Sequence, residues 1–287
     1  MHKRVILYFV LVIGFVAFNF YLRPVEGNEK VTKSYKSNGA YINDLYYSNE
    51  LFKSELSYDG KRLYEEIIDT SKNDKLEINM VCNENCSDSF NAAYSAVYLD
   101  HPELISFVGL DYCSYQNNRL KCRSMANIGK IRTLLATKRI EREIDIVKKE
   151  TKNMSDKEKI IFVYNYVASH NYDKLFTAAK SNQSAYSFFT GGSSVCAGFA
   201  KASQILLQNV GINSMLALDS QHMWNYVEYD KKWYIFDATY GSSFRDKSSK
   251  YYYEGLGDTT TGVIDHYFPE LYPKIEETTL KSLFDLK

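Results

Sequence analysis

The stretch of the chain that most constrains its fold begins with a single cysteine placed between a loop and a helix. Small and polar residues from Gly191 to Ser194 favour a loop, and apolar residues after Cys196 continue a helix that Gly211 ends. Cys196 therefore falls at or just before the amino end of the helix. There the helix dipole and the free N–H groups stabilise a thiolate and can hold an oxyanion. A buried, inert cysteine is the alternative.

Two apolar runs farther along the chain predict an antiparallel hairpin. They meet at Asp230-Lys231, which we expect to form the turn. With that turn, His222 faces Thr239. Trp224 then faces Asp237, and all four side chains share one face of the sheet. His222 and Asp237 become diagonal neighbours, whereas a slip of one residue would place them on opposite faces.

A thiol at a helix start, an imidazole and a carboxylate together form the constellation of a cysteine acyl-transferase or hydrolase. His222 would take the proton of Cys196, and Asp237 would fix the ring tautomer and stabilise the imidazolium. We therefore expect Cys196, His222 and Asp237 to be the catalytic residues. A solvated histidine and an unrelated aspartate at a strand end are the alternative from spacing alone.

The sequence around these residues resembles the core of the transglutaminase-like superfamily, and more narrowly its exported bacterial members. The blocks that match are Val195-Cys196-Ala-Gly-Phe-Ala, Gly211-Ile-Asn, His222-Met-Trp-Asn and Trp233-Tyr-Ile-Phe-Asp237-Ala-Thr. Upstream, Tyr172-Asp173 and Ser184-Ala185-Tyr186 fit the same pattern, so the resemblance is strong from about 155 to 241. It is weaker at Leu63-Tyr64-Glu65-Glu66-Ile67 and at His101-Pro102-Glu103-Leu104-Ile105.

This resemblance implies an α+β, papain-like fold, in which a helix bearing the cysteine packs on an antiparallel sheet bearing the histidine and aspartate. It implies that Cys196 is the nucleophile, His222 the general base and acid, and Asp237 its orienting partner. The implied reaction is thiolate attack on a glutamine carboxamide or peptide bond through a thioester. The superfamily holds transferases, proteases and amidases, so crosslinking, deamidation and proteolysis all stay open. A catalytically silent peptide-binding or scaffold module is the alternative of another class.

Some residues depart from that pattern or fall outside it. Met223 stands where the family usually has alanine, and no Asp-x-Asp-x-Asp-Gly loop suggests calcium, so we expect no cofactor and no metal. Tyr186 lies upstream of the cysteine and could lend a second oxyanion donor, but we favour core packing. Tyr251-Tyr-Tyr253 and Asp265-His266 follow the core, and we favour packing there too over a place beside the substrate.

The amino end carries a candidate membrane segment. His2-Lys3-Arg4 precedes an apolar run from Val5 to Phe18 that reaches Leu22, a length of about 27 Å as a helix. The basic residues favour a cytoplasmic amino end. We expect residues 1–27 to be an uncleaved single-pass anchor, with a cleaved signal peptide as the alternative. In both cases the catalytic part lies outside the cytoplasm.

The five cysteines agree with export. Asn117-Asn118 can form a two-residue turn that sets Cys113 opposite Cys122, within disulfide distance. Cys82 and Cys86 would close a second small loop. Other pairings stay open, and a zinc site is the rival, although the spacings match no common zinc pattern. Local pairing leaves the fifth cysteine free.

The chain divides into four parts by composition and pattern. We expect an anchor at 1–27, a polar linker at 28–45, a smaller α+β region with disulfides at 46–150, and the catalytic domain at 151–287. Helices are predicted over 56–68, 87–98, around 140–147 and from the capping box Ser155-Asp-Lys-Glu158 onward. Strands are predicted over 76–81 and 212–218, and the 107–125 stretch carries the hairpin that turns at Asn117-Asn118.

Composition limits the classes of partner. Lysine plus arginine and aspartate plus glutamate both total 35, so the net charge is zero, which argues against a nucleic-acid partner. A hydrophobic share of 45% is that of an ordinary globular protein. The resemblance implies a protein or peptide substrate, which we expect at the cell surface or cell wall, and the amino-terminal helix implies the membrane as a second partner.

Overall fold

The computed structural model describes residues 51–72, 77–83, 85–104, 107–116, 118–126, 130–173, 180–190, 193–219, 222–244, 248–249, 251–257 and 271–287. The predicted anchor, the linker and Asp265-His266 lie outside these residues. Across the described ranges, no helix combines the length and apolar character needed to cross a membrane.

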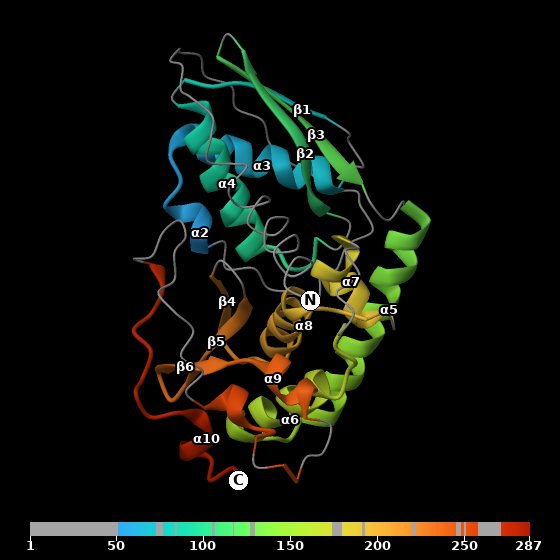
Figure 1. Ribbon diagram of the computed structural model, residues 1–287, viewed down its shortest axis with the longest axis vertical. Coiled ribbons are helices and arrows are strands. Elements are labelled where there is room, and N and C mark those ends of the chain that lie inside the picture. Colours follow the sequence, from blue (N-terminus) through green and yellow to red (C-terminus); the bar gives the residue numbers. More distant parts are fainter. Residues whose placement is uncertain are drawn as a thin grey trace, which may run out of the picture.

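The first half of the described chain is a small sheet packed against helices, in the upper part of Figure 1. The helices are α2 (Leu51–Ser54), α3 (Tyr58–Lys72) and α4 (Cys86–Asp100). The strands are β1 (Glu77–Val81), β2 (Phe107–Gln116) and β3 (Arg119–Ala126), antiparallel in the order β1-β3-β2. The α4 helix begins where Asn85 caps the N–H groups of Ser87 and Asp88, as its sequence favours.

Both predicted disulfides are confirmed. The β2–β3 ladder pairs Gln116 with Arg119 and sets Cys113 opposite Cys122, whose Cα atoms lie 4.1 Å apart. Cys82 and Cys86 form the second bridge. The turn works because Asn118 adopts a φ of 60°, which asparagine tolerates better than most residues. The rival zinc site is excluded, since all four thiols are used.

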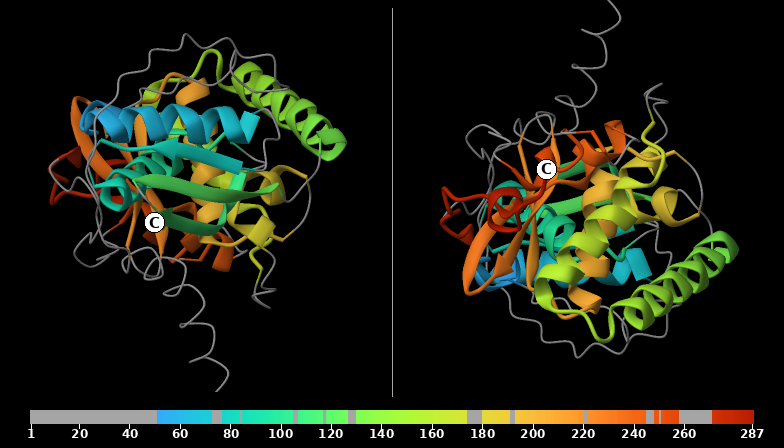
Figure 2. Two further views of the ribbon diagram at one scale, coloured as in Figure 1. Left: turned by 90° about the horizontal axis from the view of Figure 1, so that it is seen from above. Right: turned by 90° about the horizontal axis from the view of Figure 1, so that it is seen from below.

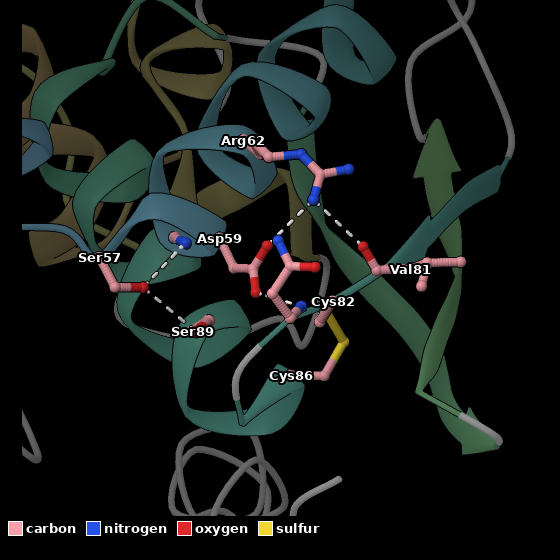
Figure 3. Close-up of polar contacts among 9 residues, drawn as sticks. Ser57, Asp59, Arg62, Val81, Cys82, Cys86 and Ser89 are labelled. Atoms are coloured by element: carbon pink, nitrogen blue, oxygen red, sulfur yellow. Dashed lines mark hydrogen bonds and ion pairs between the residues drawn. A yellow bond between two sulfur atoms is a disulfide. The ribbon is translucent and has the colours of Figure 1, made fainter. Parts of the chain in front are cut away.

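A buried carboxylate fixes α3 against β1 and the loop of the Cys82–Cys86 bridge (Figure 3). Asp59 is fully buried, so its charge needs hydrogen-bond partners. Its Oδ1 accepts from Arg62 Nη1 at 3.0 Å, and its Oδ2 accepts from the backbone N–H of Asn83. Arg62 also donates to the carbonyl oxygen of Val81, the last residue of β1, at 3.2 Å.

Two helices then lead into the second half of the fold. The long helix α5 (Lys130–Thr151) lies along one flank (Figure 2), and α6 (Asp156–Ala168) follows it. The predicted capping box is present, because Ser155 and Glu158 each accept from the backbone N–H of the other. Buried residues of both helices share one cluster with residues from three later elements, which lie at 185–189, 196–209 and 232–236. Its members include Ala136, Ile140, Ile144, Val147, Ile160, Val163, Tyr164, Phe188, Phe199, Ile205, Leu206 and Phe236.

The second sheet is the predicted hairpin with one more strand. Strands β4 (Ser214–Leu218), β5 (Met223–Tyr229) and β6 (Lys232–Phe236) are antiparallel in the order β4-β5-β6. Asp230 and Lys231 form the turn with φ values of 49° and 61°, the twist that a two-residue hairpin needs. The predicted register is confirmed, because Tyr229 pairs with Lys232 and Asn225 with Phe236.

One detail of the hairpin prediction is wrong. Strand β6 ends at Phe236, and Thr239 lies in a short helix, α9 (Ala238–Ser243), so His222 has no cross-strand partner there. The cause is local, since the Asp237 side chain accepts from the backbone N–H of Thr239 and caps the helix.

Helix α8 (Cys196–Asn209) lies at the centre of the molecule (Figure 1) and ends before Gly211, whose φ is 84°. Two short helices, η2 (Lys180–Gln183) and α7 (Ala185–Phe189), pack beside it, and η3 (Glu254–Leu256) and α10 (Leu280–Leu283) complete the second half. A second cluster joins the two halves of the fold, since α3, α4 and the first sheet share it with Ala197 and Ala200 of α8 and with β4 and β5. The result is a mixed helix and antiparallel-sheet fold, as predicted.

Candidate active site

The structure places Cys196 as the first residue of α8, with the extended residue Val195 as its cap. Its thiol is half-buried and is the free one of the five cysteines. The predicted position at the amino end of the helix is therefore confirmed.

The loop before Cys196 is held by a chain of buried polar contacts. Asp173 accepts from Asn182 Nδ2 at 2.7 Å, and its backbone N–H donates to the carbonyl oxygen of Ser194 at 2.8 Å. The carbonyl of Asn182 in turn accepts from Ser194 Oγ at 3.1 Å and from the N–H of Val195 at 3.3 Å. The Tyr172-Asp173 pair of the sequence motif thus supports the backbone that positions the cysteine.

A glycine lets α8 approach this loop closely. A Cβ added to Gly198 would lie 1.9 Å from Ser194 Oγ and 3.0 Å from the carbonyl oxygen of Ser184. Any larger residue would push the first turn of α8 away from the loop. Gly198 therefore belongs to the structure that fixes the position of the thiol.

His222 is fixed by contacts on its backbone and on its ring. Its backbone N–H donates to Asp219 Oδ1 at 2.7 Å, and its Nε2 lies 2.6 Å from Asp237 Oδ2. The ring stacks on Trp224, with centroids 6.0 Å apart and planes 15° from parallel. Because a carboxylate accepts hydrogen bonds, Nε2 carries a proton and Nδ1 is left for the thiol.

The electrostatics of His222 favour the charged ring. Burial acts to lower its pKa, but hydrogen bonds to Asp237 and to Cys196, together with their negative charges, outweigh burial and raise the pKa to about 10. The thiol and the carboxylate therefore both lie within interaction distance of the imidazole. The structure brings the three residues predicted from the sequence into one site.

Asp237 is almost completely buried, at 1% exposed, and each of its polar groups has a partner. Oδ2 contacts His222, Oδ1 accepts from Thr239 N–H at 3.0 Å, and the backbone N–H donates to the carbonyl of Gly255 at 2.8 Å. Glycine is required opposite it, because a Cβ on Gly255 would lie 1.9 Å from the Asp237 carbonyl oxygen. The carboxylate of Asp237 is thus held by two partners, and its backbone by a third.

Tyr164 on α6 supports the same corner from behind. Its side chain is fully buried, and its hydroxyl donates to the carbonyl oxygen of Tyr252 at 2.7 Å. Burial raises the pKa of Tyr164, as does the charge of Asp237, while backbone N–H groups of Gly255 and Gly241 bond to the phenol oxygen. One phenol therefore joins α6, α9 and η3 next to Asp237.

Buried amides fix α8 against the sheet, and so fix Cys196 relative to His222. Asn225 on β5 donates to the carbonyl oxygen of Ala200 at 3.0 Å and to Gln204 Oε1 at 3.1 Å. Gln204 Nε2 then donates to the carbonyl oxygen of Ser214 on β4 at 2.7 Å. Hydrogen bonds from these two side-chain amides therefore join α8 to β4 and β5, in addition to apolar packing.

Sequence reasoning missed the role of Tyr172, and it considered Tyr186 for that position. The backbone N–H of Cys196 bonds to the phenol of Tyr172, whose pKa burial and the Cys196 charge raise to about 12. Tyr172 is placed there by its bridge to Ser194 and by its contact with Phe199, at a centroid distance of 5.8 Å. Tyr186 instead packs against the apolar cluster, the role that we favoured.

Of the three tyrosines at 251–253, two pack in the core as we favoured and one does not. Tyr252 is buried and Tyr253 packs against the same cluster, whereas Tyr251 is exposed. No group of three or more histidine, cysteine, aspartate or glutamate side chains within the described ranges could hold a metal ion.

Comparisons with known proteins match part of the chain. The family model of the transglutaminase-like superfamily matches residues 144–238, which include the three site residues. A solved structure, the crystal structure of a TGase, is similar with 15% identity and a TM-score of 0.31, over 57% of this chain and 50% of that chain. The chain thus spans half the length of that structure. Comparison with curated proteins gave no match.

The family match indicates a general class of function rather than a particular reaction or substrate. Members of the superfamily are generally enzymes, and the match supports a cysteine-based acyl-transfer or hydrolase function at that level. It begins within α5 and ends at the start of α9, so it contains the loop, α8 and the second sheet. Over residues 144–238, this chain is therefore similar to the transglutaminase-like superfamily.

Proposed function

We propose that this protein is a cysteine acyl-transferase or hydrolase of transglutaminase-like type, acting on a glutamine carboxamide or a peptide bond. Cys196 is the nucleophile, His222 the general base and acid, and Asp237 the residue that orients His222. The single observation that carries the proposal is the 2.6 Å contact between His222 Nε2 and Asp237 Oδ2, which leaves the other ring nitrogen, Nδ1, for Cys196.

The first half of the reaction forms a thioester. The thiolate of Cys196 attacks the carbonyl carbon, so a C–S bond forms and the electron pair of the carbonyl moves to its oxygen. When the tetrahedral intermediate collapses, the C–N bond breaks and His222 Nδ1 donates its proton to the leaving nitrogen. Ammonia or an amine leaves, and His222 is neutral.

The second half releases the acyl group. Neutral His222 takes a proton from an incoming amine or water, whose nitrogen or oxygen attacks the thioester carbon. The C–S bond then breaks, and the thiolate of Cys196 and the imidazolium of His222 are restored. An amine gives a crosslink, while water gives an acid.

The oxyanion of both intermediates needs hydrogen-bond donors. The backbone N–H of Cys196 is one, and the phenol of Tyr172 is the second, since the two groups already bond to each other. A carbonyl oxygen that enters between them would accept from both.

Mass spectrometry of a glutamine-containing peptide distinguishes the three outcomes. The full-length protein is incubated with the peptide, with and without a primary amine, beside Cys196→Ala and His222→Ala. An amine adduct indicates transfer, conversion of glutamine to glutamate indicates deamidation, and shorter fragments indicate proteolysis. No product with the wild-type protein across varied glutamine peptides, or equal product from Cys196→Ala, would contradict the proposal.

A catalytically silent binding module is the second candidate, and the filled Cys196, His222 and Asp237 positions argue against it. A binding module has no need of a charged His222, so its affinity for peptide would survive His222→Ala. An enzyme would also keep peptide binding in that variant, but it would lose the turnover that the wild-type protein shows, whereas a binding module has no turnover to lose.

We also propose that the catalytic part lies outside the cytoplasm, held by an amino-terminal anchor or secreted. The two disulfides support an oxidising compartment. Protease treatment of intact cells tests this proposal: external protease should degrade the catalytic part while a cytoplasmic marker survives. Full protection of the chain in intact cells, with degradation only after lysis, would contradict it.

A further inference from the structure

We infer that α4 forms part of the substrate site, with Tyr98 contacting the acyl donor beside Cys196 and Lys201 acting as the positioning residue for the Tyr98 ring. The inference rests on the proposed function. It extends the site to a helix that lies outside the transglutaminase-like match at residues 144–238.

The first observation is an ammonium group held against an aromatic ring. Lys201 on α8 is only 5% exposed, and its Nζ lies 3.6 Å from the centroid of the Tyr98 ring. Burying an ammonium group costs free energy, and the face of an aromatic ring offsets part of that cost by attracting the cation. Desolvation lowers the pKa of Lys201 to about 7, and the charge of Glu103 acts in the opposite direction.

The second observation is where this places the Tyr98 ring along α8. Side chains on a helix lean toward its amino end, so Lys201 reaches back over Ala197, which is one turn earlier and follows Cys196 directly. A ring that covers Lys201 Nζ therefore lies near the amino end of α8. The electrostatics agree, because burial and then the charge of Cys196 raise the pKa of Tyr98 above its ordinary value.

The third observation is that a second residue of α4 also packs against the Tyr98 ring. Tyr94, one turn earlier on α4, stacks on Tyr98 with centroids 6.4 Å apart and planes 12° from parallel. Beneath them, Ala197 and Ala200 belong to the cluster shared with α4, and such small side chains let the helices approach. In Figure 1 the lower end of α4 points toward β4 and α8.

These contacts suit a surface that orients a substrate. With its faces packed by Lys201 and Tyr94, the ring offers its apolar edge to the methylene stem of a glutamine side chain, and its hydroxyl can exchange hydrogen bonds with an amide. Because burial and the Cys196 charge raise the Tyr98 pKa, the hydroxyl stays neutral at any working pH. Tyr98 would thus act on binding of the acyl donor rather than on the reactivity of the thiol.

The test labels Cys196 with two electrophiles of different size. One is iodoacetamide, and the other is a short peptide in which a chloromethyl ketone replaces the glutamine carboxamide. The full-length protein is compared with Tyr98→Ala, Tyr98→Phe and Lys201→Met, and with Tyr58→Ala as the matched control. Tyr58 is an exposed tyrosine on α3. The concentration of peptide reagent that gives half the maximal labelling rate is measured for each variant.

We expect Tyr98→Ala to raise this half-saturation concentration about tenfold, and Lys201→Met to raise it by about threefold. The rate with iodoacetamide should change by less than about twofold, because thiol reactivity depends on His222. Tyr58→Ala should leave both rates unchanged. Lys201→Met keeps the test valid if Tyr98→Ala fails to fold, since apolar replacements of buried charges are commonly tolerated.

Saturable labelling that is equal in the wild type, in Lys201→Met and in both Tyr98 variants would overturn the inference alone. Failure of the proposed function looks different: the wild-type protein would react with iodoacetamide but show no saturation with the peptide reagent. That result would contradict both the glutamine-type substrate and the inference that depends on it.

Discussion

At the scale of single residues, the site is built so that each reacting group has its orientation fixed by a neighbour. His222 is held by Asp219 through its backbone and by Asp237 through its ring. The signal for Asp219 was present in the sequence, since an aspartate in a turn commonly accepts from the backbone N–H of a residue two or three positions later. The contact of Tyr172 with Cys196 carried no such signal, because it depends on packing between segments far apart in the chain.

Tyr172→Phe tests the second oxyanion donor. Loss of one donor commonly lowers kcat by about 100-fold, and we expect a loss of that order here. Iodoacetamide labelling of Cys196 should stay within about twofold of wild type, because alkylation forms no oxyanion. Tyr186→Phe is the matched control and should keep wild-type kcat. Equal kcat values for the two variants would refute the role of Tyr172.

Gly255→Ala tests the support of Asp237 without changing a reacting group. The new Cβ would lie 1.9 Å from the Asp237 carbonyl oxygen, so the backbone of Asp237 must move. A shift of that kind should lower kcat by roughly 100-fold and destabilise the fold by about 1–3 kcal/mol. Gly60→Ala on α3 is the control, and its turnover should match wild type. A Gly255→Ala protein with normal turnover would show that Asp237 need not be held in place.

At the scale of elements, the local signals in the sequence predicted most of the second half of the fold. The Asp230-Lys231 turn set the register of β5 and β6, and Gly211 ended α8. The end of β6 was missed, although Asp237 followed by Ala-Thr is a helix-start signal, because apolar alternation before it favoured a longer strand. The contact of α4 with α8 could not be predicted, since it depends on tertiary packing rather than on local pattern.

Asn225→Leu tests the connection between α8 and the sheet. The substitution leaves the Ala200 carbonyl and Gln204 Oε1 without their buried donor, at a cost of about 1–3 kcal/mol. Turnover should also fall, because the spacing between Cys196 and His222 depends on this contact. The exposed Asn213→Leu serves as control and should change stability by less than about 0.5 kcal/mol. Urea unfolding checks both values, and equal midpoints for the two variants would contradict this role.

At the scale of the whole molecule, the two halves of the fold form one structure around α8. Ala197 and Ala200 pack in the cluster of the first half, while Phe199 and Ile205 pack in that of the second. Lys201 on α8 and His222 beside β5 are two groups whose shifted pKa values make the stability of this arrangement depend on pH. Their contributions to stability have opposite signs.

For Lys201, folding lowers the pKa from 10.5 to about 7, so between these values the unfolded chain binds more protons. Its contribution to the free energy of unfolding therefore rises with pH in that window. For His222, folding raises the pKa from 6.5 to about 10, so its stabilising contribution is lost as pH rises across that range.

Lys201→Met separates the two effects. Tyr98, through its ring, and Glu103, through its charge, are the groups that act on Lys201. The stability of the variant relative to wild type should be greatest near pH 7 and smallest above about pH 10, where the wild-type amine loses its proton in the unfolded chain as well. Urea unfolding at several pH values measures the difference. A difference that does not vary with pH would contradict the burial of a charged Lys201.

The pairing of Cys196 with His222 is tested most directly by the alkylation rate of Cys196 as a function of pH. With His222 charged up to about pH 10, the wild-type rate should stay nearly constant between neutral pH and about pH 9. In His222→Ala the rate should instead rise with an ordinary thiol pKa of about 8.5, which leaves roughly 1% thiolate at about pH 6.5 and a rate about 100-fold below wild type. Two superimposable profiles would contradict an imidazolium–thiolate pair, and with it the proposed chemistry of this site.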